Sequence, residues 1–546
     1  MSAAARPRTE ERSDLTNAAG QQPSAVRATA RGGAGNVVGA ATTALLNLLI
    51  VVAVTRGYDK AIAGTVFTAT AVYVVVEAIV KLGTDIGIVH FVSTAQARDE
   101  RERVAQHLWA SLVPVAVVSV IGAAVTYVAA PVLMRAIGTA GAQHSDRTIV
   151  LVVAIGIPVG AIYDCLTAAT RGMGRARPTV LVERTLRPVL QAGGVLAAAL
   201  VGASTSVVVF AWVAPYAVVL PIMSVLLVRL MRREGVPRYS SRWREVLGEV
   251  WRFTLPRTLT SVIQVLLQRL DIILVGALLG APSAAVYTGA TRFVVVGQLG
   301  NQGVAFAFQP QLARLVATRQ LDAGRDLYRL SSAWIAGLTA PLYLAVCVTA
   351  PWLIRIFGHH YQSGLSSMII VTGAMLVGNA CGLVDLVLIT LGRTSWNLAN
   401  SAVALALNVG LDLLLIPRIG IVGAAIGWAV AIVANNIVPV LQVRFTYGFS
   451  PLSRIWAELL GVVGVLYGAL PGLTLWVSHS NSVAVLGALV VATLVYAAIL
   501  WRSRTKLGLH DVIESRRGSA RGGGVGRGGR PEVRVGGEGA ESPDHA

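Results

Sequence analysis

The chain has 546 residues, of which 55% are hydrophobic and 13% are charged, about half the charged share of soluble proteins. This number of charges is too small to solvate the surface of a soluble chain of this length. The composition therefore excludes a soluble protein and indicates a polytopic membrane protein. The net charge of +19 does not predict a nucleic-acid partner, because nearly all the basic residues are arginines scattered between apolar runs. No nucleic-acid binding is therefore expected.

The chain begins with a polar, arginine-bearing stretch, residues 1–33, which we predict to be a disordered N-terminus. Apolar runs of about 20 residues then recur, which is the length that a helix needs to cross a bilayer. They predict about fourteen transmembrane helices, at 34–55, 64–92, 107–130, 148–170, 184–201, 207–228, 251–277, 286–309, 327–350, 365–391, 395–415, 419–441, 455–477 and 483–501. The uncharged run 188–228 is divided at residues 202–206, where turn-forming residues cluster.

The arginines between the spans predict how the chain is inserted. With both tails left out, the connectors on the side of the two termini carry 22 basic residues, and the opposite connectors carry six. Positive charges collect on cytoplasmic loops, so both termini are predicted to be cytoplasmic and the protein to lie in the cytoplasmic membrane. The Gly/Arg-rich tail, residues 502–546, is predicted to be disordered and cytoplasmic.

An internal repeat predicts two related halves. VFTATAVYVVV (66–76) aligns with VYTGATRFVVV (286–296), which matches the second span with the eighth. Because both spans enter from the same side, the repeat is parallel, about an axis along the membrane normal. The predicted organisation is an N-lobe of six spans (34–228), a cytoplasmic linker (229–250), a C-lobe of six spans (251–441) and a terminal pair of helices (455–501).

Five stretches combine small and apolar residues with isolated polar ones. They are GAGNVVGAATTALLNLLI (33–50), KLGTDIGIVHFVS (81–93), QRLDIILVGALLGAPSAAVYTGATRFV (268–294), QPQLARL (309–315) and LNVGLDLLLIPRIGIVGAAIGWAVA (407–431). In order and spacing they resemble the polysaccharide flippases of the multidrug/oligosaccharidyl-lipid/polysaccharide exporter superfamily, over about residues 33–500. The resemblance implies an all-α, V-shaped transporter with two pseudo-symmetric six-helix lobes. Such a flippase exports a polyprenyl-pyrophosphate-linked oligosaccharide from the inner to the outer leaflet by alternating access, for cell-surface polysaccharide biosynthesis.

Polar side chains inside the spans are candidates for the transport pathway, because an ionisable residue at bilayer depth tends to face a cavity or a partner. In the seventh span the polar residues recur every three or four positions and fall on one face: Arg257, Ser261, Gln264, Gln268 and Asp271. This stripe predicts a helix that lines the cleft between the lobes. Hydrogen bonding to neighbouring helices is the alternative.

The guanidinium fork matches phosphate oxygens in pairs, so cationic residues are candidates for binding a pyrophosphate headgroup. The candidate contacts are Lys81, Arg257, Arg269 and Arg292. Lys81 alternatively forms a structural ion pair with Glu77, one turn earlier on the same helix. The membrane potential alone favours outward movement of an anion, and coupling to a proton or sodium ion is an additional hypothesis. Its candidate residues are Glu77, Asp271 and Asp385.

In the eleventh span, Asn397 and Asn408 share a face and are candidates for contacts with sugar hydroxyls or with neighbouring helices. No zinc-protease, hydrolase or P-loop motif occurs in the connectors, so no cofactor is expected. An enzyme acting on lipid-linked sugars is disfavoured, because the predicted outer connectors are short. Besides the lipid-linked substrate and the bilayer, a polysaccharide polymerase and glycosyltransferases are the expected partners.

Three alternatives to an oligosaccharide flippase follow from the same residues. A lipid II flippase makes the same physical demands on its cavity but carries a different glycan, and the sequence does not distinguish the two. A multidrug cation antiporter of the same superfamily calls for carboxylates in the cavity, whereas the first span has Asn36 and Asn47 but no Asp or Glu. A scaffold without transport activity has no need of the polar face on the seventh span.

Overall fold

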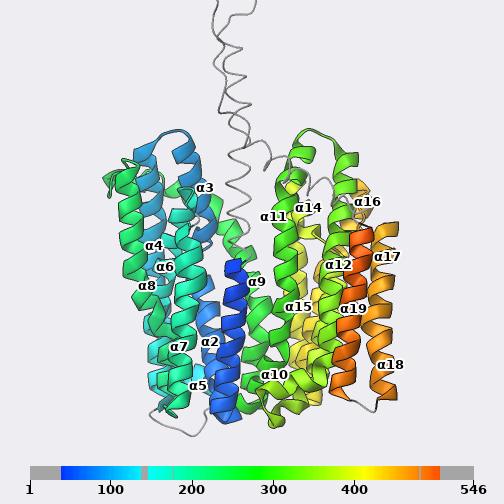
Figure 1. Cartoon of the computed structure of the whole chain (residues 1–546). Coiled ribbons are helices and arrows are strands. Elements are labelled where there is room, and N and C mark those ends of the chain that lie inside the picture. The colour runs from blue at the N-terminus through cyan, green and yellow to red at the C-terminus, as the bar shows by residue number, and fades with distance from the viewer. Residues whose placement is uncertain (1–37, 137–144, 176, 479–480, 504–546) are drawn as a thin grey trace, which may run out of the picture. The chain divides into compact units, whose positions relative to one another are not determined.

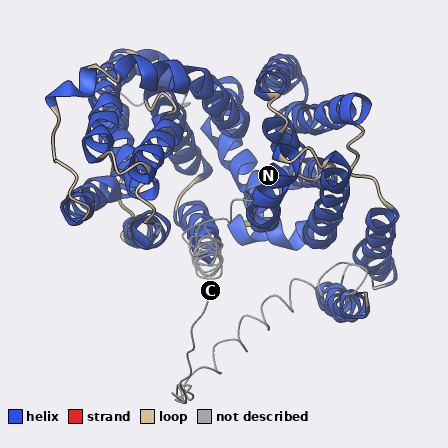
Figure 2. Cartoon of the chain, turned by 90° about the horizontal axis from the view of Figure 1, so that it is seen from above, coloured by secondary structure: helices blue, strands red, loops and turns tan. Residues whose placement is uncertain are grey.

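The computed structural model describes residues 38–136, 145–175, 177–478 and 481–503. All regular elements in these ranges are helices, which satisfy their own backbone groups without water (Figure 2). Twelve of these helices are long and apolar enough to cross a membrane, and the first is Val38–Gly57. The predicted all-α polytopic membrane fold is therefore confirmed. The predicted disordered N-terminus and all but the first two residues of the predicted tail lie outside the described ranges.

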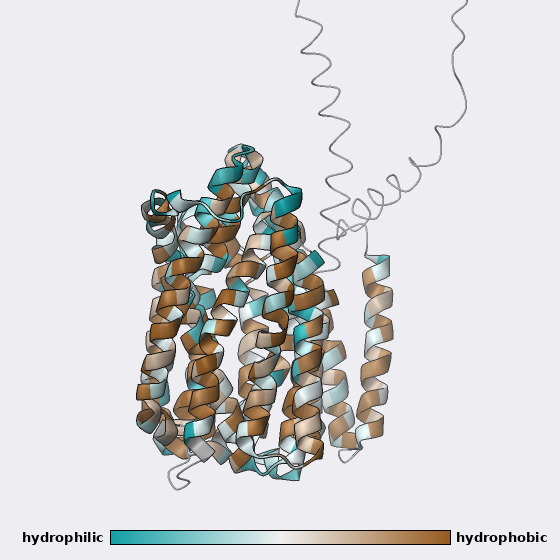
Figure 3. Cartoon of the chain, turned by 90° about the vertical axis from the view of Figure 1, so that its left-hand side faces the viewer, coloured by the Kyte–Doolittle hydropathy of each residue, from teal (hydrophilic) through white to brown (hydrophobic). Residues whose placement is uncertain are grey.

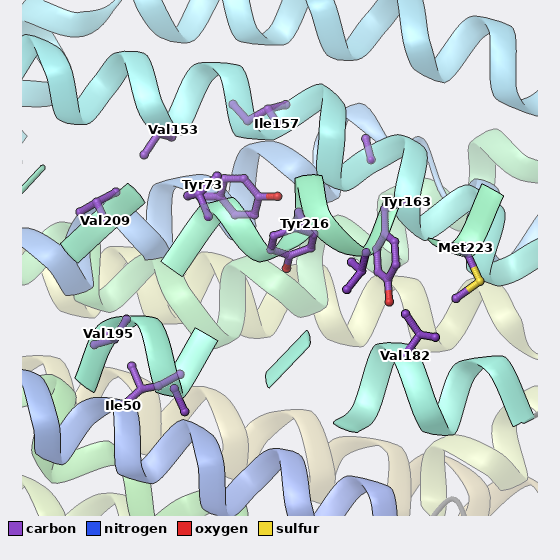
Figure 4. Packing of buried hydrophobic residues seen from close by; sticks show 14 of the residues in the cluster. Ile50, Tyr73, Val153, Ile157, Tyr163, Val182, Val195, Val209, Tyr216 and Met223 are labelled. Carbon is purple, nitrogen blue, oxygen red and sulfur yellow. The ribbon is translucent and has the colours of Figure 1, made fainter. Parts of the chain in front are cut away.

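The helices of the first half pack on one another and form what we call the first bundle, residues 38–233. Its elements after Val38–Gly57 are α2 (Lys60–Val80), α3 (Thr84–Ala97), α4 (Arg101–Val128), α5 (Ala130–Ala136), α6 (Ser145–Gly172), the π-helix η1 (Thr179–Leu186), α7 (Arg187–Leu200) and α8 (Thr205–Arg233). Helix α6 packs on α3, α4 and α8, and α7 packs on α8. Figure 4 shows Tyr73, Tyr163 and Tyr216 in the core that these helices enclose.

The second half begins with η2 (Ser241–Arg244), α9 (Leu247–Leu279), α10 (Ala281–Thr291) and η3 (Arg292–Val294). We call the helices that follow, residues 295–447, the second bundle: α11 (Val295–Ala317), α12 (Leu321–Leu353), η4 (Ile354–Phe357), η5 (His359–Gly364), α13 (Leu365–Ala380), α14 (Val384–Thr390), α15 (Thr394–Ile419) and α16 (Ile421–Tyr447). The chain continues with α17 (Arg454–Val463), the π-helix η6 (Gly464–Ala469), α18 (Leu470–Val477) and α19 (Ser482–Arg502). Residues 497–503 belong to a separate unit, and the account below concerns residues 38–496.

Helices α9 and α10 join the two bundles (Figure 1). The first turns of α9 pack on α3 and α4, where Phe91 and Val250 share a buried cluster, and its later turns pack on α15. Helix α2 packs along both α9 and α10. The closest approach is at Gly64 of α2, where an added Cβ would overlap the backbone of Ala281. The predicted repeat pairs α2 with α10, so the two matched segments meet at the junction of the bundles.

Two predicted spans are broken in the structure. The run 365–391 is divided between α13, which ends at Ala380, and α14, which begins at Val384, with Gly382 between them at a φ of 72°. The run 64–92 was expected to be continuous, but α2 ends at Val80 and α3 begins at Thr84. The reason is a turn in which Leu82 and Gly83 have φ angles of 51° and 64°. Glycine adopts this left-handed conformation without a steric penalty, and it ends the helix. Lys81 therefore lies at the end of α2 and not within a continuous helix.

The predicted division of the long uncharged run 188–228 is observed. The predicted turn at residues 202–206 is confirmed, because α7 ends at Leu200 and α8 begins at Thr205. The predicted spans 184–201 and 286–309 are helical but are not among the twelve apolar spans. Both contain a change of helix type: η1 runs into α7, and η3 separates α10 from α11.

The surface of the bundles is apolar along the helices and polar at their ends (Figure 3). Large apolar side chains such as Val128, Leu200 and Trp476 are more than three-quarters exposed, as expected for residues that face lipid. We call the end that carries the connectors 98–100, 173–178 and 234–246 the arginine-rich end. Its cytoplasmic location stays a prediction from the charge bias.

Candidate functional site

Three adjoining cavities lie at the junction of the bundles. The amide cavity, of about 420 Å³, is enclosed by α9, α11, α13 and α16. The interface cavity, of about 260 Å³, lies between the helix Val38–Gly57, the η1–α7 segment and α11. The arginine cavity, of about 90 Å³, lies between α9, the segment from α10 to α11, and α16. Gln298 of α11 lines all three, so the cavities meet at this side chain.

The amide cavity is polar but uncharged. Eight of its lining residues are amides: Gln264, Gln268, Gln298, Asn301, Gln302, Asn379, Asn435 and Asn436. Among the described residues, no charged side chain lines it. Gln264 Nε2 donates a hydrogen bond to Ser401 Oγ at 3.2 Å, and Trp428 Nε1 donates to the carbonyl of Leu267 at 2.9 Å. The cavity therefore offers many hydrogen-bond donors and acceptors around a fixed indole ring.

The arginine cavity brings together Arg269 and Arg292. Asp271 also lines it, but the Tyr287 hydroxyl donates a hydrogen bond to one oxygen of this buried carboxylate. Arg292 forms no ion pair with Asp271, and its Nε donates to the carbonyl of Thr288 at 3.3 Å. Neither arginine is within ion-pair distance of a carboxylate in the part of the chain that the structure describes. Two guanidinium groups thus share one small cavity with a single carboxylate that forms no ion pair with either of them.

The interface cavity has charged groups on the side of the first bundle. It is lined by Glu183, Arg184 and Arg187 from the η1–α7 segment, opposite Gln298 and Gln302 of α11. Arg187 is held in place, because its Nη1 donates to Tyr216 Oη at 2.7 Å and its guanidinium lies 4.9 Å from the centre of that ring. The π-helical turns of η1 alter the helical register just before Arg187, and such turns are frequent at functional sites.

Lys81 lies in the first bundle and lines none of these three cavities. The pairing with Glu77 that we weighed from the sequence is absent. Lys81 follows the last residue of α2, and its Nζ reaches Asp164 Oδ2 at 2.6 Å. Glu77 is buried, and its Oε1 has no hydrogen-bond partner among the described residues. The observed ion pair therefore joins α2 to α6.

The ion pair gives a first prediction, which separates a structural role of Lys81 from a role in substrate binding. The side chains of Lys81 and Asp164 are only 19% and 27% exposed. Either Asp164→Asn or Lys81→Met alone should therefore lower the free energy of unfolding by up to about 3–5 kcal/mol. The double variant Lys81→Met/Asp164→Leu should recover most of this loss in thermal unfolding. If the double variant also transports, Lys81 is structural; if it is stable but inactive, Lys81 contacts the substrate.

The remaining predicted residues are dispersed. Arg257 is exposed, and its guanidinium stacks over the ring of Phe253 at 3.7 Å. Asn408 donates to Asp412 Oδ2 at 3.1 Å and is buried. The predicted residues outside the three cavities are Glu77, Lys81, Arg257, Ser261, Asp385, Asn397 and Asn408. Those that the cavities bring together are Gln264, Gln268, Arg269, Asp271 and Arg292.

Sequence reasoning missed the residues that α11 and the η1–α7 segment contribute. Gln298, Asn301 and Gln302 are spaced at +3 and +4 and so share one face of α11, a signal that the sequence GQLGNQG carries. Arg187 was counted with the connector arginines that predict topology. The helical segment begins at Thr179, five residues before the predicted span, and thereby places this side chain among helices.

A sequence model of a family described as "Polysaccharide biosynthesis protein" matches residues 62–364, which is more than half of the chain. The chain belongs to this family. The resemblance to polysaccharide flippases is thereby confirmed at the level of the family. The chain is also similar to a curated protein, the "Probable low-salt glycan biosynthesis flippase Agl15" of Haloferax volcanii, with 22% identity over 206 residues. The match covers 36% of this chain and 43% of Agl15, so it spans less than half of that relative's length.

Solved structures show the fold of this family member. The lipid II flippase MurJ in an inward closed conformation superposes with a TM-score of 0.65 at 12% identity, over 85% of this chain and 98% of that chain. An inward-facing multidrug resistance MATE family transporter of the MOP superfamily gives a TM-score of 0.60 at 16% identity, over 76% of this chain and 95% of that chain. At these identities the likeness shows a common transporter fold and says nothing about the substrate.

Proposed function

We propose that this member of the polysaccharide biosynthesis protein family is a flippase. It moves a polyprenyl-pyrophosphate-linked oligosaccharide from the cytoplasmic to the outer leaflet, by alternating access and without an enzymatic step. The observation that carries the proposal is the arginine cavity, where Arg269 and Arg292 form no ion pair in the described structure, beside an uncharged amide cavity. The family match and the glycan flippase named above support it.

The chemistry of the arginine cavity fits a pyrophosphate. A diphosphate ester carries about two negative charges, and a guanidinium presents paired donors in the geometry of phosphate oxygens. An anion that enters the cavity meets two half-buried cations and one carboxylate, a net positive charge, whereas a cationic drug would meet charge of the same sign. Outward movement of each negative charge gains about 2.3 kcal/mol per 100 mV when the inside is negative. Ion coupling through Glu77, Asp271 or Asp385 remains a hypothesis beside this one.

Contacts between the bundles fit a state that is closed away from the arginine-rich end. Arg56 donates from Nε to the carbonyl of Ile356 at 2.7 Å and from Nη2 to that of Arg355 at 2.8 Å. Lys60 Nζ donates to the carbonyl of His360 at 3.3 Å. The interface cavity begins near Asn47, about 13 Å back along the helix from Arg56. Alternating access requires that these bridging contacts break when the cavities open to the other leaflet.

Reconstitution tests the proposal. The full chain in liposomes is offered three fluorescent lipids: a polyprenyl-pyrophosphate-linked disaccharide, lipid II and a lipophilic cation. Transfer between leaflets is read by a membrane-impermeant quencher, with protein-free liposomes as the control. We expect the pyrophosphate-linked disaccharide to cross faster than the other two, and faster with the receiving side positive. Faster movement of the cation would contradict the proposal in favour of a multidrug antiporter, and faster movement of lipid II would assign that substrate instead.

A further inference from the structure

Two of the amides that line the amide cavity are buried. Asn379 of α13 is 6% exposed and Asn435 of α16 is 7% exposed. Asn435 Oδ1 has no hydrogen-bond partner within the described residues, and Asn379 lies against the side chain of Tyr343. Buried polar groups in proteins are nearly always paired, so a cavity lined by eight amides indicates a ligand that both donates and accepts hydrogen bonds.

The missing partner is an uncharged, hydroxyl-rich group. A hydroxyl both donates and accepts a hydrogen bond, and each amide side chain offers one group of either kind. A phosphate or a carboxylate would lie in this cavity without a counter-charge, because no charged residue of the described chain lines it. An apolar chain would offer no partner to the amide groups that are not already bonded within the protein. The indole of Trp428, fixed by its hydrogen bond to Leu267, adds an apolar face of the kind that packs on the C–H face of a sugar ring.

We propose that the amide cavity is the glycan subsite of the transporter and that it takes neutral sugar residues. This inference rests on the proposed function. The cavity volume of about 420 Å³ lies in the usual range for small-ligand sites. The amide and arginine cavities share Gln268, Gln298 and Trp428, so a sugar in one is contiguous with a pyrophosphate in the other. A uronic acid at the same position is disfavoured, because its carboxylate would be buried without a cation.

Substitutions of the two amides test the subsite. Leucine is close in shape to asparagine, so Asn379→Leu and Asn435→Leu remove a hydrogen-bonding group without opening a cavity. Binding to the full chain in lipid nanodiscs is measured by calorimetry for two probes: a polyprenyl pyrophosphate carrying an N-acetylglucosamine disaccharide, and the same polyprenyl pyrophosphate without sugar. We expect each variant to bind the disaccharide lipid about ten-fold more weakly than the wild type and the sugar-free lipid equally well.

Asn397→Leu is the matched control. Asn397 is 8% exposed and its Oδ1 also lacks a partner among the described residues, but it lines none of the three cavities. This variant should bind both probes like the wild type. The thermal unfolding temperature of all three variants should equal or exceed that of the wild type, since a buried amide is replaced by an apolar group of similar shape.

The outcomes separate this inference from the proposed function. Equal losses for both probes, or unchanged binding of the disaccharide lipid by both variants, would overturn the glycan subsite. A wild-type protein that binds the sugar-free lipid as tightly as the disaccharide lipid would overturn it too, while leaving the pyrophosphate site intact. A wild-type protein that binds neither probe would remove the proposed function together with the inference.

Discussion

Replacing Arg269 and Arg292 together by glutamine is expected to abolish transport of the pyrophosphate-linked glycan, while the protein remains folded and inserted. Both side chains line the arginine cavity and form no ion pair in the described structure, and the buried Asp271 beside them keeps its hydrogen bond from Tyr287 when they are removed. A hydrogen bond to a charged group contributes about 1.5–3 kcal/mol, so the loss of two predicts at least a 100-fold lower initial rate. The liposome assay measures that rate.

Two controls accompany this prediction. Lysines at both positions keep the charge but lose the fork geometry, so Arg269→Lys/Arg292→Lys should give an intermediate rate. Arg418→Gln changes an exposed arginine that bonds a carbonyl of its own helix, and it should transport like the wild type. A glutamine double variant that keeps half of the wild-type rate would exclude the arginine cavity as the headgroup site.

Adding a methyl group at Gly64 is expected to have the second large effect. Gly64→Ala places a Cβ into the backbone of Ala281, and backbone atoms cannot move aside as a flexible side chain does. Overpacking of this kind costs about 1–3 kcal/mol, and here the strain separates α2 from α10 at the junction of the bundles. We therefore expect a lower thermal unfolding temperature together with slower transport.

Gly410→Ala provides the matched control for this substitution. Gly410 also lies within a helix, α15, but an added Cβ there meets no heavy atom within 4 Å. This change should leave transport unaltered and raise stability by about 0.5–1 kcal/mol, because alanine is the better helix former. A lower unfolding temperature for Gly64→Ala together with a higher one for Gly410→Ala would support a tight contact at Gly64. Equal unfolding temperatures for the two variants would show that α2 and α10 do not meet closely.

The fold could be predicted from the sequence because apolar length and charge bias act locally. Runs of about 20 apolar residues can satisfy their backbone in lipid only as helices, so the span boundaries followed from composition. The break after Val80 was missed, although Gly83 marks it, because the flanking residues are apolar on both sides. Hydropathy does not distinguish a helix from two helices joined by a left-handed turn.

The site was only partly predictable, because which polar faces meet depends on how distant helices pack. Gln264, Gln268 and Asp271 of the polar stripe on α9 line the cavities, and periodicity on a single helix is visible in the sequence. Its cationic member Arg257 lies instead on an exposed face against Phe253. The pairing of Lys81 with Asp164 joins residues 83 positions apart, and no local pattern reports such a contact.

The bridging contacts of Arg56 and Lys60 have a consequence for the evolution and the energetics of opening. Their acceptors are main-chain carbonyls of the η4–η5 segment, so changes in the side chains at positions 355, 356 and 360 leave the acceptors in place. When these contacts break, neither cation leaves a carboxylate of the described residues, and water replaces the carbonyls at the exposed Arg56 and the half-exposed Lys60 with little penalty. These contacts therefore tolerate side-chain substitutions in the η4–η5 segment, and they break without a large electrostatic barrier.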